Sequence, residues 1–253
     1  MQQHRPTPPL TWLEPGQPFP PLSQAWGPDS DASGLLAASD RLDATRLLEA
    51  YRQGIFPWFS PGQPVLWWSP DPRMVLHTHE FKLHRSLRQA LKHWTITPGV
   101  ELVFDRDFPQ VITRCSQAQR PGQSGTWIVP AMVEAYIKLH RMGLAHSAEV
   151  WRDGQLLAGL YFVSLGHAVF GESMFTTVRD GSKMALAMLV SVARHHGVPL
   201  IDCQQNTQHL ASLGAREIAR QDFVRHVAAA QAQASIAWTS ETLYWDTLTC
   251  LAP

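Results

Sequence analysis

The chain has 253 residues, of which 45% are hydrophobic, so it can form one large domain or two small ones around a sizeable core. Its 21 basic residues balance its 21 acidic residues, which leaves only a local basic patch as a means of binding nucleic acid. The three cysteines have neither disulfide-framework nor metal-site spacing. The Pro-rich N-terminus lacks the features of a signal peptide, and no apolar run reaches membrane-spanning length, so we expect a soluble, cytoplasmic protein.

The first part of the chain is rich in turn signals. Residues 1–34 carry many Pro and Gly residues and are expected to form an irregular head. A helix is predicted from Asp43, which can cap its start, to Gly54, which can end it. Prolines exclude a central strand or a helix from residues 55–72, so we expect an ordered loop there, with a brief extended piece at 65–68. The elements predicted next are a strand at 73–77, a basic helix at 81–94, an extended segment at 95–105 and a helix at 106–117.

A change of pattern near residues 123–126 predicts a boundary between an N-terminal domain, residues 35–122, and a catalytic domain, residues 123–253. The expected elements of the second domain are a helix at 131–143, three extended segments between 146 and 175, a helix at 182–197, a strand at 198–203, a short helix ending at Gly214 and a helix at 220–233. A helix that connects two strands of one sheet implies a parallel pair, so we expect an α+β fold with a mixed sheet. Ligands gather at the carboxyl ends of such strands, where Glu172 and Asp202 lie.

Two segments at these strand ends carry polar side chains. Asp202 and Gln204 are two residues apart, so on a regular strand they face the same side and can both reach one bound group. The alternative is that Asp202 caps the following helix. Glu172 lies in an apolar strand, where a carboxylate needs a partner, either an internal Arg or the ammonium group of a substrate. Gly171 beside it permits close approach of a ligand or of another backbone.

Two further segments have two interpretations each. The helix at residues 81–94 is a solvated face or a surface for phosphate groups, and its basic residues are Lys82, Arg85, Arg88 and Lys92. The loop at residues 55–72 is an apolar strap between two layers or an aromatic wall on which a base can stack.

The segments GIFPWFSPGQPVLWWSPDPR, GTWI, HSAEVW, FGESMF and LIDCQ, in this order, resemble the leucyl/phenylalanyl-tRNA–protein transferase family, and the resemblance runs from about Leu35 to about Val227. It implies a bacterial enzyme that transfers Leu or Phe, and less readily Met, from aminoacyl-tRNA to the α-amino group of proteins that begin with Arg or Lys. That transfer marks them for degradation by the N-end rule. The resemblance also implies that the C-terminal domain is similar to the GCN5-related N-acetyltransferase fold.

The resemblance assigns expected roles to individual residues. Asp202 and Gln204 match the catalytic pair, and Glu172 matches the residue that holds the donor's amino group. Trp58 and Trp127 match aromatics around the terminal adenosine. The positions that match the pocket for the Leu or Phe side chain are Gly171, Ser173, Met174, Leu186, Ile201, Leu160 and Ala193. Leu160, Val169 and Ala193 differ from the family's usual bulky residues at their positions. The tRNA surface would include Lys82, Arg85, Arg88 and Lys92.

The donor ester is already activated on tRNA, so we expect no cofactor and no metal ion. The expected partners are aminoacyl-tRNA and proteins with N-terminal Arg or Lys, bound by a monomer away from membranes. Two other functions stay open at this point. One is a CoA-dependent N-acyltransferase, although the segment TTVRDGSK before the crossover helix offers a single Gly rather than a Gly-rich pyrophosphate loop. The other is a non-catalytic module that binds the aminoacyl end of tRNA.

Overall fold

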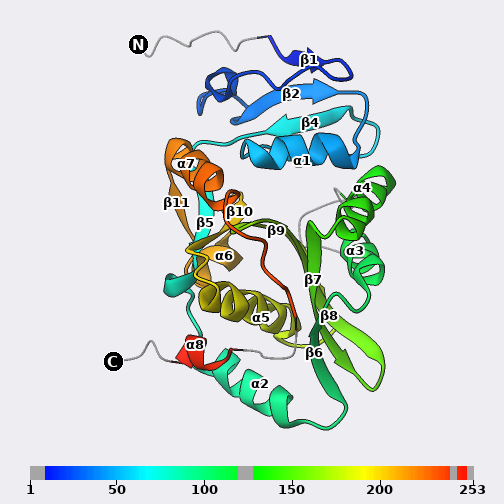
Figure 1. Cartoon of the computed structure of the whole chain (residues 1–253), viewed down its shortest axis with the longest axis vertical. Helices are drawn as coiled ribbons and strands as arrows, with labels where there is room; N and C mark the ends of the chain where they lie inside the picture. The colour runs from blue at the N-terminus through cyan, green and yellow to red at the C-terminus, as the bar shows by residue number, and fades with distance from the viewer. Residues whose placement is uncertain (1–8, 119–127, 240–243, 250–253) are drawn as a thin grey trace.

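The computed structural model describes residues 9–118, 128–239 and 244–249, and the strands within them form two sheets (Figure 1). The smaller sheet has the order β1-β2-β4-β3. Its strands are β1 (Thr11–Leu13), β2 (Leu35–Ser39), β3 (Phe56–Pro57) and β4 (Val65–Trp68). Helix α1 (Ala44–Arg52) connects β2 to β3 and lies between the two sheets in Figure 1.

The larger sheet has the order β11-β5-β10-β9-β8-β7-β6. Its strands are β5 (Arg73–His77), β6 (Val100–Phe104), β7 (Ala145–Arg152), β8 (Gln155–Leu165), β9 (Ala168–Thr176), β10 (Leu200–Gln204) and β11 (Arg216–Ile218). Strands β9 and β10 are parallel, and the other neighbouring pairs in the described part of this sheet are antiparallel. The sheet is therefore mixed, which confirms the predicted α+β class.

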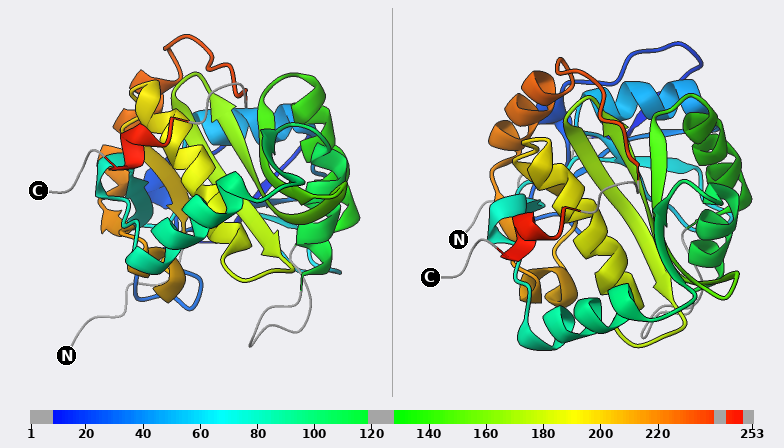
Figure 2. Two further views of the ribbon diagram at one scale, coloured as in Figure 1. Left: turned by 90° about the horizontal axis from the view of Figure 1, so that it is seen from below. Right: turned by 60° about the horizontal axis from the view of Figure 1, so that its bottom comes forward.

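Helices cover both faces of the larger sheet. Figure 2 shows α5 on one face and the pair α3 and α4 on the other. The bounds after α1 are α2 (Arg85–Ile96), α3 (Phe108–Gln117), α4 (Pro130–Arg141), α5 (Gly181–His195), α6 (Gln208–Ser212), α7 (Arg220–Ala230) and α8 (Asp246–Thr249), and the two 3₁₀ helices are η1 (Leu22–Gln24) and η2 (Thr78–Glu80).

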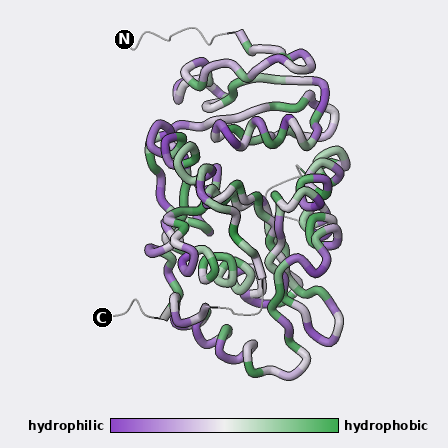
Figure 3. The backbone as a smooth tube through the Cα atoms, in the orientation of Figure 1, coloured by the Kyte–Doolittle hydropathy of each residue, from purple (hydrophilic) through white to green (hydrophobic). Residues whose placement is uncertain are grey.

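The two faces of the larger sheet belong to two apolar clusters. The first cluster joins one face to α1, α3, α4, α7 and the smaller sheet. The second joins the opposite face to α5, and α5 and its neighbouring strands are mostly hydrophobic in Figure 3. Because α5 leads from β9 to β10, both strands end on the same side of the sheet. The parallel neighbours β9 and β10 thus lie with one face against each apolar cluster.

Several local predictions are confirmed. The side chain of Asp43 caps α1 by accepting the backbone N–H of Arg46 at 2.8 Å. The hairpin between β7 and β8 turns at Asp153-Gly154, where both residues have positive φ (50° and 76°). Positive φ at both central residues is typical of the type I′ turn, whose twist matches that of the flanking strands.

Other local expectations differ from the structure. Strand β4 is an inner strand of the smaller sheet, although we predicted only a brief extended piece; its four residues contain no proline, and Pro57 lies in the edge strand β3. Strand β1 lies in the head expected to be irregular. Helix α2 begins at Arg85, later than expected, because the backbone N–H of Lys82 donates to the carbonyl of Leu213 at 2.8 Å.

The change from one sheet to the other falls between β4 and β5, whereas the sequence suggested a domain boundary near residue 122. The larger sheet takes β5 and β6 from the segment that we assigned to the N-terminal domain. Within residues 9–118, 128–239 and 244–249, no helix is long and apolar enough to cross a membrane.

Candidate active site

Strands β9 and β10 are both irregular, β10 at its end and β9 in its middle, so Glu172 does not lie at a strand end as the sequence suggested. Along β9 the pairing with β8 steps from Ser173, opposite Tyr161, to Gly171, opposite Phe162, so Glu172 is an extra residue that forms a bulge. Along β10 the pairing with β5 steps from Asp202 to Gln204, so Cys203 is extra. Bulges redirect side chains and are enriched next to active sites. Two neighbouring bulges in adjacent strands therefore mark this part of the sheet as a candidate site.

The carboxylate of Glu172 is held by hydrogen-bond donors from two helices and one strand. Tyr51 of α1 donates to Oε1 at 2.6 Å and Tyr136 of α4 donates to Oε2 at 2.9 Å. The two hydroxyl oxygens are 2.5 Å apart, and both tyrosines are fully buried. The Nε2 group of Gln204 donates to Oε1 at 3.2 Å. The partner that Glu172 needs is thus a set of neutral donors, not the internal Arg considered from the sequence.

Burial dominates the electrostatics of this cluster. It raises the pKa of Glu172 to about 7, while the hydroxyl groups of Tyr51 and Tyr136 oppose the rise. Burial, together with the charge of Glu172, also raises the pKa of both tyrosines well above 10.0. The tyrosines are therefore neutral donors near neutral pH, and Glu172 can gain or lose a proton there.

Asp202 forms a buried ion pair with Arg73. The Nε and Nη2 groups of Arg73 donate to the two carboxylate oxygens at 2.7 and 2.6 Å, and both side chains are fully buried. The guanidinium group lies over the rings of Phe56 and Phe223, with its central carbon 4.7 and 4.4 Å from their centroids. Its Nη1 group donates to the carbonyl of Gly54 at 3.1 Å. A bidentate pair of this kind is geometrically rigid.

The bulge in β10 gives Gln204 an unusual backbone conformation, which Asp202 stabilises. Its φ is 58°, in the left-handed region, and its backbone N–H donates to Oδ1 of Asp202 at 3.0 Å. Both side chains nevertheless lie on the side of the first apolar cluster, since the partner of Asp202 is packed against Phe223 and the partner of Gln204 against Tyr51. Asp202 does not cap α6, since Thr207 does so through its side chain. Asp202 instead fixes the backbone that aims Gln204 at Glu172.

The residues expected to line an apolar pocket gather on the other face of the sheet. With α5 they belong to the second apolar cluster, where Met174 is partly exposed and the rest are buried. These residues are Leu160, Val169, Met174, Leu186, Ala193 and Ile201. Ser173 is buried in β9. A Cβ atom added to Gly171 would lie 3.4 Å from the carbonyl oxygen of Asp202, so this position brings two backbones close together.

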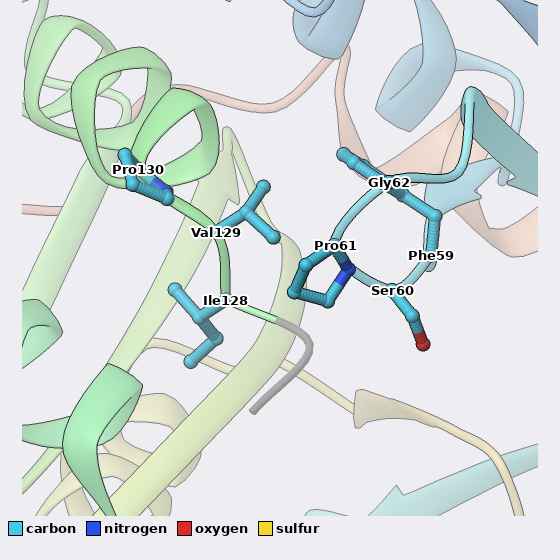
Figure 4. Close-up of a pocket in the computed structure, with 7 residues that line it drawn as sticks. All are labelled: Phe59, Ser60, Pro61, Gly62, Ile128, Val129 and Pro130. Carbon is cyan, nitrogen blue, oxygen red and sulfur yellow. The ribbon is translucent and has the colours of Figure 1, made fainter. Parts of the chain in front are cut away.

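The loop after β3 borders a cavity of 360 Å³ (Figure 4). One wall is the loop from Phe59 to Gly62, and the other runs from Ile128 to Pro130, where α4 begins. Trp58, which precedes the loop, is 36% exposed and packs edge-on against Trp68 with 5.5 Å between ring centroids. Trp127 lies outside the described residues. The two walls are continuous with strand β3, whose Phe56 packs on Arg73, and with helix α4, whose Tyr136 donates a hydrogen bond to Glu172.

The basic residues predicted for tRNA contact are exposed on and before α2. The helix buries Leu87 and Leu91 on its inner side. The exposed basic set is Lys82, Arg85, Arg88 and Lys92. Figure 1 places α2 at the opposite end of the larger sheet from α1. The structure therefore separates these four residues from the site at the two bulges.

Sequence reasoning missed Tyr51, Tyr136 and Arg73. The two tyrosines occupy helix positions that fit an apolar core, although a buried tyrosine hydroxyl usually has a partner. Arg73 is a single charge at the start of an apolar strand. A buried Asp202 required such a countercharge, so this residue was open to prediction.

The fold is of the α+β class, and similarity to known proteins places the chain among the transferases. The family model described as leucyl/phenylalanyl-tRNA protein transferase matches residues 75–228, and the model of the N-terminal domain of the same family matches residues 40–71. The chain therefore belongs to the leucyl/phenylalanyl-tRNA protein transferase family.

Individual relatives agree. A leucyl/phenylalanyl-tRNA–protein transferase from Polaromonas sp. is 58% identical over 237 residues, which are 94% of this chain and 93% of the relative. One from Albidiferax ferrireducens is 57% identical over 241 residues, 95% of each chain. Among solved structures, L-PGS from Bacillus licheniformis is 11% identical and covers 70% of this chain and 57% of its own, with a TM-score of 0.36. That likeness is too low to support an inference, so the expected GCN5-related fold stays a prediction.

Proposed function

We propose that this protein transfers Leu or Phe, and less readily Met, from aminoacyl-tRNA to the α-amino group of proteins that begin with Arg or Lys. Family membership supports the aminoacyl transfer. The observation that carries the proposal is the cluster of Glu172, Tyr51, Tyr136 and Gln204 at the bulges of two adjacent strands. We place the protein in the cytoplasm, because aminoacyl-tRNA and newly made proteins occur together there. We expect it to act as a monomer.

The reaction has modest chemical needs. The acceptor amine attacks the carbonyl carbon of the donor ester, so a C–N bond forms and the bond to the ribose oxygen of the terminal adenosine breaks. The amine's proton leaves with that oxygen. An α-amino group has a pKa of about 7.7–8.0, so on the order of a tenth is free base near neutral pH. Positioning of amine and ester is therefore the larger task, and it can contribute several kcal/mol.

The side chains divide this task. Glu172 in its charged form binds the α-ammonium of the donor, while Tyr51 and Tyr136 fix the direction of its carboxylate. Gln204 orients the acceptor amine through its amide group. Asp202 is a positioning residue, because both of its oxygens are occupied by Arg73 and one also accepts the backbone N–H of Gln204. A proton relay through Asp202 does not fit this pairing.

The rest of the donor has two proposed contacts. We assign the terminal adenosine to the cavity between the loop that follows Trp58 and the start of α4. Trp127, which the family resemblance assigns to the same adenosine, lies outside the described residues. The apolar residues packed with α5 suit the Leu or Phe side chain. The tRNA body then reaches the basic residues of α2 at the far end of the molecule. A long substrate is consistent with this separation.

The test is a transfer assay with tRNA carrying radiolabelled Leu and a peptide that begins with Arg. We expect label in the peptide, and none in a matched peptide that begins with Glu. Omission of CoA should have no effect. Label that stays on tightly bound tRNA, with no transfer, would contradict the proposal and favour a binding module; transfer that requires acyl-CoA would favour a CoA-dependent acyltransferase. Sedimentation of the active protein tests the monomer.

A further inference from the structure

The chain after α7 crosses the sheet face on which α5 lies. This C-terminal strap, residues 231–239, begins beside the turn between β8 and β9, where the N–H of His167 donates to the carbonyl of Ala230 at 2.9 Å. Gly166 in that turn leaves room for it, since an added Cβ would lie 2.6 Å from the carbonyl oxygen of Gln233. In Figure 1 the strap runs in orange to red across the sheet toward α5. It lies beyond residues 75–228, the range matched by the family model.

The chain that follows the strap is fixed to the end of α5. The ring of Tyr244 stacks on that of His195, with centroids 3.4 Å apart and planes 3° apart. The Nη1 group of Arg194 donates to the carbonyl of Thr247 at 2.7 Å. The strap is therefore held on both sides of its crossing, and its apolar side chains have defined positions.

Trp238 is the large apolar residue of the strap. It is 6% exposed and packs edge-on against Phe162 with 4.7 Å between ring centroids. It also contacts Phe104 and His146, at 6.0 and 6.2 Å. In the sheet Phe162 pairs with Gly171. Trp238 thus stands over the row of the sheet that contains Gly171, next to Glu172.

The row beside it holds residues that we assign to the donor pocket. Leu160 pairs with Met174, and both lie in the same apolar cluster as Phe162 and Trp238. A Cβ atom added to Gly171 would have the carbonyl oxygen of Asp202 and Cγ2 of Ile201 within 4 Å, and no other described atom beyond its chain neighbours. On the side of Phe162, such a Cβ atom would therefore touch no described side chain.

The indole N–H of Trp238 is a second, independent observation that indicates a ligand. It is buried and has no hydrogen-bond partner among the described residues. Buried polar groups in native proteins nearly always have a partner, and buried Trp N–H groups usually find one. An acceptor oxygen of a bound donor, such as its ester carbonyl, would supply that partner.

We infer that Trp238 forms the wall of the donor side-chain pocket opposite Ile201 and sets the size of the amino acid that is transferred. The inference rests on the proposed function, since it names a specificity residue for that reaction. The indole bounds the space above Gly171, so a smaller ring at position 238 deepens the pocket. A deeper pocket favours Phe over Leu.

The test compares Trp238→Phe with the parent protein in competition between Leu-tRNA and Phe-tRNA. We expect the ratio of kcat/KM for Phe to that for Leu to rise on the order of 10-fold, as for other pockets that change by a few carbon atoms. The matched control is Trp245→Phe, the same change in the same C-terminal region, and its ratio should equal the parent's. Thermal unfolding of each variant shows that the protein is folded.

An unchanged ratio in folded Trp238→Phe would overturn the inference. If that variant does not fold, a photo-crosslinking experiment on the parent protein tests the inference. The probe is a phenylalanyl ester of adenosine that carries a diazirine on the phenyl ring, and it is bound to the protein and photolysed. Attachment to the peptide that contains Trp238 supports the inference, and attachment only elsewhere overturns it. A parent protein that transfers neither amino acid contradicts the proposed function instead, so the two failures are distinguishable.

Discussion

Glu172, Tyr51 and Tyr136 form a triangle of three close oxygen contacts. When Glu172 is charged, the two hydroxyl groups supply two protons for three contacts. A proton on the carboxyl group allows a closed ring in which each group donates once and accepts once. Both protonation states of Glu172 therefore find hydrogen-bond partners in the triangle, and it is burial that raises its pKa. Binding of a donor ammonium supplies a cation that favours the charged form instead.

Glu172 should make stability depend on pH. Its pKa is about 7 in the folded protein and about 4.3 in an unfolded chain. The folded state thus holds the proton more tightly, so stability due to this group is greatest below pH 4.3 and is lost as the pH rises to about 7. We expect Glu172→Gln to remove this loss. Urea unfolding at intervals between pH 4 and pH 8 measures it, and parallel curves for both proteins would contradict it.

The ion pair of Arg73 and Asp202 should respond unequally to single and double replacement. Asp202→Leu leaves a buried guanidinium without its partner, and about 3–5 kcal/mol of stability should be lost. Arg73→Met should cost a similar amount. The double variant contains no buried charge at this place and should recover most of the loss. Unfolding free energies of the four proteins test this, and additive losses would rule out the coupling.

The Arg73→Met/Asp202→Leu double variant also distinguishes an effect on stability from an effect on transfer activity. It lacks the carboxylate that accepts the backbone N–H of Gln204. We therefore expect a folded protein with reduced transfer. Recovery of full activity together with stability would show that Asp202 has no positioning role.

Individual residues show how far the sequence could lead. Glu172, Asp202 and Gln204 stand out because polar side chains in apolar strands are costly to bury without a partner. Their partners do not stand out. Tyr51 precedes Glu172 by 121 positions, and Arg73 precedes Asp202 by 129. Only the packing of separate elements brings such residues together, and a local pattern carries no information on it.

At the scale of elements, the bulge in β10 depends on one backbone conformation. Gln204 has φ 58°, which costs a non-glycine residue about 1–2 kcal/mol. Gln204→Ala and Gln204→Gly both remove the amide group and should both reduce transfer. The Gly variant should be more stable than the Ala variant by about 1 kcal/mol, since Gly adopts this conformation freely. Unfolding free energies measure the difference, and a less stable Gly variant would contradict the assigned strain.

Helical periodicity and turn residues predicted most elements, because those signals are local. The capped helix α1 and the Asp-Gly hairpin are examples. Strands β1 and β11 have three residues each and exist through pairing with neighbours distant in sequence. The grouping of β5 and β6 with the larger sheet has the same origin. Pairing between distant segments is a property of the folded chain, so no short pattern shows it.

At the scale of the whole molecule, a formal charge of zero leaves tRNA binding to local groups. We expect Arg85→Ala/Arg88→Ala to weaken tRNA binding most at low salt. The slope of log K against log salt should fall by about one unit for each phosphate group that the variant no longer neutralises. Titrations at several salt concentrations measure it.

The control for this prediction is Arg225→Ala. Arg225 is an exposed residue of α7 that pairs with Asp222 at 3.3 Å. Its removal should leave the slope unchanged. A slope that changes equally in both variants would show that binding depends on overall charge and not on α2.

The contacts that assemble the site have a kinetic consequence. Tyr51 comes from the segment before β3, Glu172 from β9, and Arg73 and Asp202 from strands far apart in chain order. Closing loops of this length delays folding, and contacts between remote segments form after local ones. The helices can therefore be complete while the site is still absent. During refolding, transfer activity should return with the slowest phase, after the far-ultraviolet circular dichroism signal has recovered.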